Sequence, residues 1–350
     1  MTKHILNFLL ILLPAITTAA LDKQYVYTQI SHNEGLTSTV NCIYKEKDGP
    51  VWIGTPNGLY SFNGYTLSSY GRLLDRGRRV FGLDVDRKGD MWVLTDRHVF
   101  KRKGEEDTFQ KMSEEEAVFF CMTEDNEGLW LGSTKHIYRY RHSDNSLVPA
   151  INLPSGIECR SICMPDDSTL LCCSHGGKIL IDLSSGEISE APFGNIPQVY
   201  ASLVDRKGRI WLALYNNGIE VYDKDGTKVK EYRTGNSGLS NDIVLCLEER
   251  DKHILAGTDG GGINVIDPET DEIRVISHVS GDPSSFPDHS VKSIHIDDYG
   301  NIWAGSIRNG LISIRLSSMN SYQDTYLGQS NGLSNPTVLC LHQDKQSGYI

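Results

Sequence analysis

The chain has 350 residues, 39% of them hydrophobic and 23% charged, which is enough to bury the core of one large domain or two average ones. Lys and Arg total 34 against 45 Asp and Glu, and the formal charge of −11 argues against a nucleic-acid-binding protein, whose binding surface is normally basic. Glycine is frequent, with 33 residues, and no long stretch has the period of an amphipathic helix. The composition therefore favours a protein of short strands and turns.

The first 20 residues predict an export signal. Lys3 and His4 form a short basic start, an apolar run extends from Ile5 to Ile16, and four small residues end at Ala20. The apolar run is shorter than the roughly 20 residues that a membrane-spanning helix needs. We therefore predict a signal peptide over residues 1–20, cleaved after Ala20, and a location outside the cytoplasm for the mature chain. An uncleaved anchor remains the alternative.

A large apolar residue recurs at one position of a sequence motif that repeats about every 40 residues. The motif begins with an acidic residue and a glycine and continues into an apolar strand that ends in small residues, as in "VWIGT" at Val51–Thr55. Leu171 and Leu255 occupy the position in two repeats, and tryptophan does so in the other five: Trp52, Trp92, Trp130, Trp211 and Trp303. The sequence therefore contains seven repeats.

Each repeat contains four short runs with strand character. In the first repeat these runs lie at Thr39–Tyr44, Val51–Thr55, Leu59–Phe62 and Tyr65–Tyr70, separated by glycine turns. Asn63-Gly64, between the third and fourth runs, predicts a type I′ hairpin turn. Four strands in about 40 residues indicate one blade of a β-propeller. We predict an all-β fold, a seven-bladed β-propeller of four-stranded blades over residues 21–328, in which the five tryptophans are structural anchors between blades.

A further repeat begins near the end of the sequence. The segment Thr325–Leu341 matches Glu231–Leu247 without gaps, and both contain G-L-S-N and V-L-C-L. We therefore expect residues 329–350 to be the truncated start of a next propeller repeat, in an N-terminal fragment of a longer protein.

The eight cysteines are spread over the repeats rather than arranged as a disulfide framework. Five of them lie in the apolar run before a glycine turn, in separate repeats: Cys42, Cys121, Cys163, Cys246 and Cys340. This placement predicts small, buried, free thiols. Cys159, Cys163, Cys172 and Cys173 fall within one repeat, so that one bridge among them remains open.

The order of these motifs, from G-L-S-N through the acidic-glycine turn to the "IWxGT" strand, resembles the two-component regulator propeller repeat. This repeat is found in periplasmic sensors of hybrid two-component systems from Bacteroidetes, and the resemblance covers roughly residues 25–350. The fourth repeat departs from it, because it lacks both the glycine turn and the tryptophan.

The resemblance implies a longer receptor around this chain. It implies a second propeller, an immunoglobulin-like domain and an inner-membrane helix, followed inside the cell by histidine kinase, receiver and DNA-binding domains. It also implies an oligosaccharide ligand and control of glycan-utilisation genes, and we expect the full-length receptor to be a homodimer.

Motifs for catalysis or metal binding are weak. The run Asp84–Asp90 lacks the later ligands of a calcium loop, and the offset from Asp86 to Gly89 differs from that of a sialidase Asp-box. We expect no cofactor, no metal site and no enzyme activity within these 350 residues. A secreted propeller enzyme that acts on glycans, or a protein-binding scaffold, remains the alternative.

One face of the predicted propeller collects basic and aromatic residues. The loops that enter the innermost strands and those that join the second and third strands meet on this face. They carry Arg78, Arg79, Arg97, Lys135, Arg160, Tyr200, Tyr215, Asn217 and Arg308. Because the arginine fork binds carboxylate and sulfate groups, we predict that this face binds a neutral or acidic oligosaccharide, or a partner domain that closes over it. A solvated rim with counter-charges is the simpler alternative.

Overall fold

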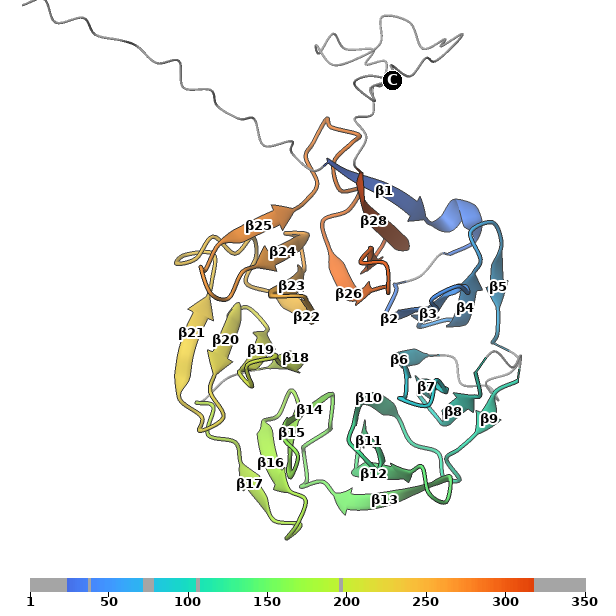
Figure 1. The fold of residues 1–350 in the computed structure, drawn as a ribbon, viewed down its shortest axis with the longest axis vertical. Coiled ribbons are helices and arrows are strands. Elements are labelled where there is room, and N and C mark those ends of the chain that lie inside the picture. The colour runs from blue at the N-terminus through green and yellow to red at the C-terminus, as the bar shows by residue number, and fades with distance from the viewer. Residues whose placement is uncertain (1–23, 37–38, 72–78, 105–107, 195–197, 318–350) are drawn as a thin grey trace, which may run out of the picture. The chain divides into compact units, whose positions relative to one another are not determined.

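The computed structural model describes residues 24–36, 39–71, 79–104, 108–194 and 198–317. It confirms the all-β fold, because seven separate four-stranded antiparallel sheets form the blades of a propeller (Figure 1). The propeller is one compact unit, Val26–Arg315. Its described part includes one short 3-10 helix, His32–Glu34, and no helix there is long and apolar enough to cross a membrane. The predicted signal peptide at 1–20 and the further repeat at 329–350 lie outside the described residues.

Blades one to six each take four consecutive strands, ordered from the central axis outward. Blades one and two consist of β2 (Cys42–Lys45), β3 (Val51–Thr55), β4 (Gly58–Phe62) and β5 (Leu67–Ser69), then β6 (Val80–Val85), β7 (Met91–Thr95), β8 (Val99–Arg102) and β9 (Gln110–Lys111). Blades three and four consist of β10 (Phe119–Glu124), β11 (Gly128–Ser133), β12 (His136–Arg141) and β13 (Ser146–Asn152), then β14 (Ser161–Asp166), β15 (Thr169–Cys173), β16 (Lys178–Asp182) and β17 (Ile188–Glu190). Blades five and six consist of β18 (Val199–Val204), β19 (Ile210–Leu214), β20 (Ile219–Tyr222) and β21 (Lys228–Tyr232), then β22 (Val244–Arg250), β23 (His253–Thr258), β24 (Ile263–Ile266) and β25 (Ile273–Ile276).

Blade seven closes the ring with strands from both ends of the propeller. Its inner strands are β26 (Val291–Ile296), β27 (Ile302–Ser306) and β28 (Leu311–Ser317), and its outermost strand is β1 (Gln24–Ile30). The Gln29 side-chain amide donates a 2.9 Å hydrogen bond to the backbone carbonyl of Asn309, which lies 280 residues further along the chain. The first strand of the fold is therefore held by the last blade.

The seven repeat positions found in the sequence are equivalent in the sheets. Each anchor residue lies on the second strand and pairs directly with the innermost strand, in the pairs Trp52–Tyr44, Trp92–Asp84, Trp130–Thr123, Leu171–Cys163, Trp211–Leu203, Leu255–Glu248 and Trp303–His295. Trp52, Trp92 and Trp211 are fully buried. The leucines at two of the seven positions therefore occupy the same place in their blades as the tryptophans do in the other five.

The indole nitrogens explain why an acidic residue precedes each tryptophan. Trp92, Trp211 and Trp303 donate hydrogen bonds of 2.9–3.0 Å to a carboxylate oxygen of the aspartate that starts the preceding turn. The other oxygen of that aspartate accepts backbone N–H bonds within the turn, as Asp86 does from Lys88 and Asp90. One carboxylate thus stabilises the turn and satisfies a buried indole N–H, which is otherwise costly to bury.

The glycine in "VWIGT" is required by the close approach of neighbouring blades. A Cβ atom on Gly54 would collide with the thiol of Cys42 and would lie 2.7 Å from Val80 on the next blade. Gly257 meets Cys246 and Val291 in the same way. Small thiols on the innermost strand and a glycine on the second strand therefore share one tight space, and the seven described cysteines are free. Cys340 lies outside the described residues.

The predicted type I′ turn at Asn63-Gly64 is wrong. That turn needs a positive φ at both residues, and among them only Gly64 has one, at 98°. The loop between β4 and β5 is longer, and the Asn63 carboxamide oxygen accepts the backbone N–H groups of Tyr65 and Thr66. The asparagine therefore organises the loop through its side chain rather than through a left-handed backbone.

Candidate functional site

One residue of each innermost strand, or just before it, is left out of the blade's regular pairing. In five blades the pairing of the two inner strands skips a residue near the start, and the skipped residues are Phe81, Phe120, Tyr200, Leu245 and Lys292. Asn41 and Arg160 occupy the same place immediately before β2 and β14. A β-bulge of this kind redirects a side chain away from the sheet. We call these seven residues the bulge ring.

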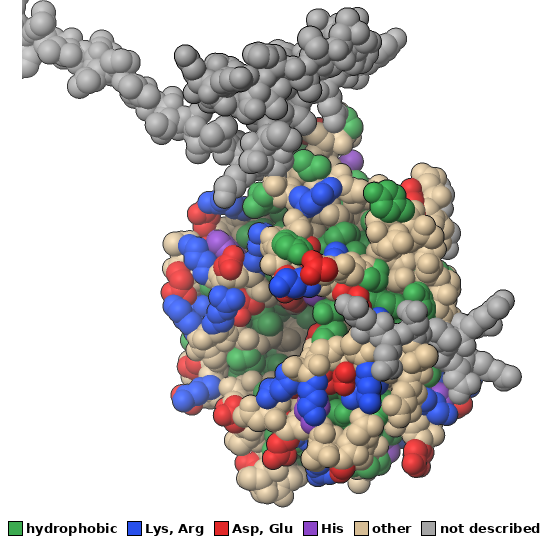
Figure 2. Space-filling view, turned by 45° about the vertical axis from the view of Figure 1, so that its right-hand side comes forward, with side chains coloured by type: hydrophobic (Ala, Val, Ile, Leu, Met, Phe, Trp, Pro, Cys, Tyr) green, Lys and Arg blue, Asp and Glu red, His purple; other side chains and the backbone are tan. Residues whose placement is uncertain are grey.

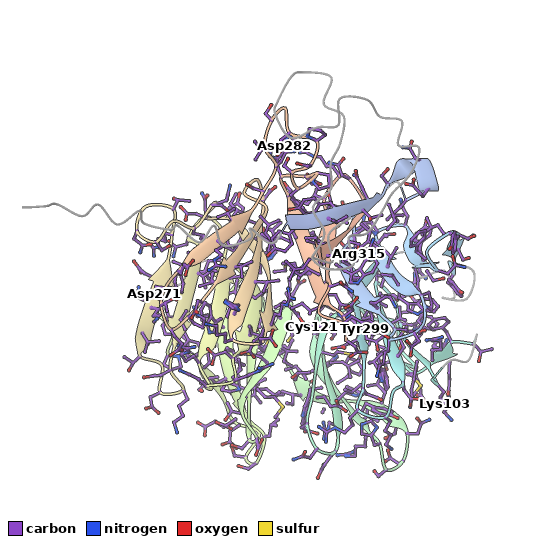
Figure 3. The ribbon with its side chains drawn as sticks, turned by 45° about the horizontal axis from the view of Figure 1, so that its top comes forward. Lys103, Cys121, Asp271, Asp282, Tyr299 and Arg315 are labelled. Carbon is purple, nitrogen blue, oxygen red and sulfur yellow. The ribbon has the colours of Figure 1, made fainter. Side chains whose placement is uncertain are left out.

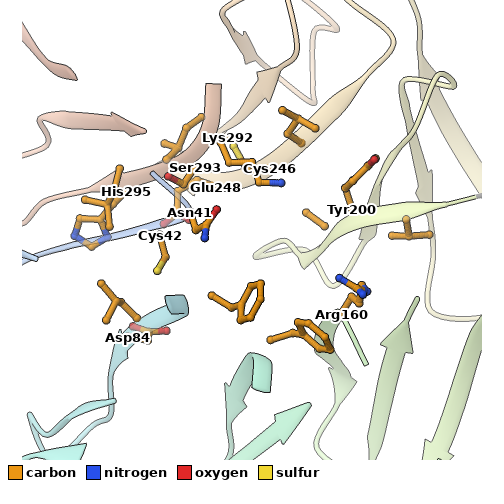
Figure 4. A pocket seen from close by; sticks show the side chains of 18 of the residues that line it. Asn41, Cys42, Asp84, Arg160, Tyr200, Cys246, Glu248, Lys292, Ser293 and His295 are labelled. Carbon is orange, nitrogen blue, oxygen red and sulfur yellow. The ribbon is translucent and has the colours of Figure 1, made fainter. Parts of the chain in front are cut away.

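The bulge ring lines a pocket in the central channel of the propeller. The pocket has a volume of about 580 Å³, and all seven members of the ring contribute to its wall (Figure 4). Further along the inner strands the wall includes Cys42, Asp84, Cys246, Glu248, Ser293 and His295. The size is within the usual range for small-molecule sites. Because every blade supplies one ring residue, the site exists only when the propeller is closed.

Cations and aromatic rings alternate in one part of the bulge ring. The Arg160 guanidinium lies 4.4 Å from the centre of the Phe120 ring, and the Lys292 ammonium lies 5.7 Å from that of Tyr200. The Tyr200 ring also contacts His175, at 5.6 Å between ring centres, and Tyr215, at 5.9 Å. These contacts hold the charges against ring faces, where cation–π attraction is favourable.

The two cations differ in their acidic neighbours. Arg160 pairs with Glu158 at 2.6 Å at the edge of the site, where both side chains are partly exposed. Lys292 forms no ion pair within the described part of the chain, and burial lowers its pKa. Burial also lowers the pKa of His175, and the charges of Arg160 and Lys292 act on it in the same direction. The three basic groups are therefore close enough to influence one another.

Deeper in the channel the charge changes sign. Asp84 and Glu248 follow Phe81 and Leu245 by three residues on β6 and β22, which is about 10 Å along a strand. Desolvation in the channel raises the pKa of Asp84 to about 6, with Glu124 and Asp86 as further causes, and that of Glu248 to about 7, with Asp84 and Glu249 as further causes. The channel therefore has a basic and aromatic level at the bulge ring and an acidic level below it.

The structure brings together three of the nine residues predicted to bind a ligand. Arg160 and Tyr200 belong to the bulge ring, and Tyr215 contacts Tyr200 from the neighbouring loop. Arg79, Arg97, Lys135 and Arg308 are exposed and do not line the channel pocket, and Arg97 pairs with Glu116 at 3.0 Å.

The two remaining predicted residues lie elsewhere. Asn217 lines a separate cavity of about 360 Å³ with Glu220 and Lys228. Arg78 lies outside the described residues.

The prediction missed Asn41, Phe81, Phe120, Leu245 and Lys292 of the bulge ring. Their signal was present in the repeat, because Arg160 and Tyr200 already occupy the equivalent position one repeat apart. Applying that position to every repeat would have identified the whole ring. A choice of residues by charge alone instead favoured the exposed arginines.

The surface outside the channel offers no comparable feature on the face that Figure 2 shows. There, Lys and Arg side chains are interspersed with Asp and Glu. Across the described ranges, no cluster of three or more His, Cys, Asp and Glu side chains is arranged to hold a metal ion. The channel pocket is therefore the candidate functional site.

Sequence comparison and structure comparison give different results. No model of a known protein family matches the chain, and no curated protein does. Among solved structures, the extracellular domain of a putative hybrid two-component system from B. thetaiotaomicron is 18% identical with a TM-score of 0.70, over 89% of this chain and 44% of that one. A second such domain from the same organism is 22% identical with a TM-score of 0.67, over 86% and 40%. Streptogramin B lyase is 15% identical with a TM-score of 0.64, over 84% and 98%.

The chain thus spans less than half the length of the two extracellular domains. Likeness at this level of identity establishes the fold and leaves function to be argued from the site. In its seven-bladed fold the chain is similar to the extracellular domains of hybrid two-component systems, which agrees with the resemblance of its repeats to the two-component regulator propeller.

Proposed function

We propose that this chain is the extracytoplasmic ligand-sensing propeller of a hybrid two-component receptor that controls glycan utilisation. The observation that carries the proposal is the bulge ring, which builds one pocket from all seven blades of a fold shared with extracellular domains of such systems. In this proposal the pocket binds an oligosaccharide and has no catalytic role. The receptor continues with a second propeller, a membrane anchor and a histidine kinase, and acts as a periplasmic homodimer.

The composition of the pocket supports a saccharide ligand. Phe81, Phe120 and Tyr200 offer apolar ring faces, whereas Asn41, Arg160 and Lys292 offer hydrogen-bond donors at the same level. A sugar ring has both an apolar face and a rim of hydroxyl groups, so it can use both kinds of contact. Small-molecule sites combine apolar walls with a few placed polar groups in this manner.

Calorimetry of the complete extracytoplasmic region against a panel of neutral and acidic oligosaccharides tests the proposal. We expect one saccharide class to bind, and we expect Tyr200→Ala to weaken that binding at least about tenfold, because the substitution removes a ring face from the wall. Tyr65→Ala is the matched control, since Tyr65 is 96% exposed and lies outside the pocket. If no saccharide binds, or if Tyr200→Ala binds as wild type does, the proposal fails.

The same samples distinguish a sensor from a glycan-active enzyme. Asp84 and Glu248 have raised pKa values in one channel, and a pair of carboxyl groups is the usual machinery of glycoside hydrolysis. We expect every oligosaccharide of the panel to be recovered intact by mass spectrometry after incubation with the protein. Cleavage that disappears in both Asp84→Asn and Glu248→Gln would show an enzyme instead.

A further inference from the structure

The basic groups at the bulge ring converge from different blades on one place. Arg160 comes from blade four and Lys292 from blade seven, and Lys292 lies over Tyr200 of blade five. His175, on the loop between β15 and β16, contacts the same tyrosine ring. In Figure 4, Arg160 and Tyr200 occupy one side of the pocket, and Asp84 and His295 the other. Tyr200 is therefore the centre around which the basic side chains gather.

This convergence of basic groups is electrostatically unfavourable in itself. Burial is the largest cause of the lowered pKa of Lys292, and the charge of Arg160 lowers it further, whereas Asp259 acts in the opposite direction without forming an ion pair with Lys292 in the described structure. A partly desolvated cation without an ion-pair partner costs free energy, which a bound anion recovers. Glu158 partly neutralises Arg160 from the edge of the site, but it forms no ion pair with Lys292 in the described structure.

The acidic level of the channel determines how far an anion can enter. Asp84 and Glu248 lie about 10 Å beyond the bulge ring along their strands, and in their ionised form they repel a negative group. An anionic ligand is therefore attracted to the ring and stopped there, with its remaining part directed away from the acidic level. This arrangement favours a ligand with its charge at the end that enters the channel.

We propose that the bulge ring binds the carboxylate or sulfate group of an acidic saccharide between Arg160 and Lys292, with the sugar ring against Tyr200 and Phe120. The saccharide part of this inference rests on the proposed function. The anion part rests on the two cations and on the acidic level below them. Charge-assisted hydrogen bonds from these cations give the acidic ligand its advantage over a neutral one.

Calorimetric titration of the extracytoplasmic region with matched probes tests the inference. The probes are glucuronate and glucose, galacturonic acid trimers and the same trimers with their carboxyl groups reduced to alcohols, galactose 6-sulfate and galactose, and inorganic sulfate, all at one ionic strength. We expect at least one acidic probe to bind at least about tenfold more tightly than its neutral partner. We also expect this preference to shrink as sodium chloride is added.

Substitutions identify the groups responsible. Arg160→Met and Lys292→Met should each lower the affinity for the acidic probe about tenfold or more, and Arg160→Lys should retain part of it. Glu158→Gln should increase the affinity, because it removes the carboxylate that competes for Arg160. Arg141→Met and Lys224→Met are charge-matched controls on exposed side chains outside the pocket, and we expect them to bind as wild type does.

The possible outcomes separate this inference from the proposed function. Equal binding of acidic and neutral saccharides would leave the sensor in place and overturn the anion site. Binding of inorganic sulfate without any saccharide, lost in Lys292→Met, would support the anion site and overturn the saccharide sensor. If no anion binds, or if Arg160→Met and Lys292→Met both bind the acidic probe as wild type does, the inference is wrong.

Discussion

The indole nitrogen of Trp211 donates a 2.9 Å hydrogen bond to Oδ2 of Asp205, six residues earlier in the chain. Burial acts to raise the pKa of Asp205, but hydrogen bonds from Trp211 and Arg209 outweigh it and hold that pKa below its usual value. The same carboxylate accepts the backbone N–H groups of Lys207 and Arg209 through Oδ1. One aspartate thus connects the turn, the second strand and the space between blades.

Replacement of Trp211 by alanine should lower the free energy of unfolding by roughly 3–5 kcal/mol, because it leaves a cavity among buried side chains. Trp211 is fully buried and stacks on Tyr232 with 5.6 Å between ring centres. Urea denaturation measures the loss. Affinity for the proposed saccharide should change only through stability, so a variant that keeps its melting temperature but loses binding would show that the indole has a direct role in binding.

The contribution of the hydrogen bond can be isolated by a double-mutant cycle with Trp211→Phe and Asp205→Asn. Each single change should cost about 1–3 kcal/mol, because each leaves a buried polar atom without its partner. The double variant should cost less than the sum, since both changes remove the same bond. Strict additivity would contradict a direct coupling between the two side chains.

Gly54→Ala should destabilise the propeller by about 1–3 kcal/mol through overpacking between blades one and two. The added methyl group would meet Cys42 and Val80. Cys42→Ala should recover part of the loss, because it removes the thiol from the shared space. Gly235→Ala is the control, since a Cβ there meets nothing within 4 Å and its φ is not positive. Melting temperatures that are equal for Gly54→Ala and Gly235→Ala would contradict the packing argument.

The acidic level of the channel should make stability fall as the pH rises from about 4 to 7. Asp84 and Glu248 have raised pKa values of about 6 and 7, against about 4 in an unfolded chain. The folded state therefore binds more protons than the unfolded state between these pH values. The stability that this proton binding contributes is complete below about pH 4 and is lost as the pH passes about 7. The double variant Asp84→Asn, Glu248→Gln should melt higher than wild type at pH 8 and about equally at pH 4.

Two comparisons make the pH experiment specific. His175 and His295 have lowered pKa values and contribute the opposite slope, but they are present in both proteins and cancel in the difference. Asp225→Asn, an exposed turn residue, should give no pH-dependent gain. If the double variant does not gain stability at pH 8, the carboxyl groups are not desolvated in the folded channel.

The described cysteines should resist alkylation until the protein is unfolded. Burial raises the pKa of Cys163 and Cys246 to about 12, so that little thiolate is present near neutral pH. Cys121, on β10 (Figure 3), has its sulfur 3.8 Å from that of Cys159, well beyond the length of a disulfide bond. Mass spectrometry after iodoacetamide treatment, with and without urea, measures this. A native bridge between any two of these residues would contradict the structure.

The architecture was predictable because a propeller repeats one packing problem seven times. Trp92 and Trp211 occupy equivalent positions in the repeats and in the sheets. Leu171 occupies the same position in its blade, so the position is kept even where the residue is not tryptophan. The closure of blade seven by β1 was not predictable, because the amino-acid sequence of Gln24–Ile30 does not indicate which strand it pairs with.

The binding site was predictable only in part. Charge drew attention to Arg160 and also to exposed residues such as Arg97, which pairs with Glu116 on the surface. What separates a channel side chain from a surface one is its position at or just before the start of the innermost strand, and no residue type encodes that position. Phe120 and Lys292 share it although their side chains have nothing in common.

The position of β1 in the last blade also bears on how the protein is made. Gln24–Ile30 is synthesised before the rest of the propeller, yet this strand can pair only after β28 has been made. Gln29 and Asn309, which then come into contact, are 280 residues apart in the chain. Until then blade seven lacks its outermost strand and β28 has an unpaired edge, and such edges are prone to aggregation. Because every blade contributes to the channel, a half-made propeller has no channel pocket, and copies that stop short of closure cannot bind a molecule there.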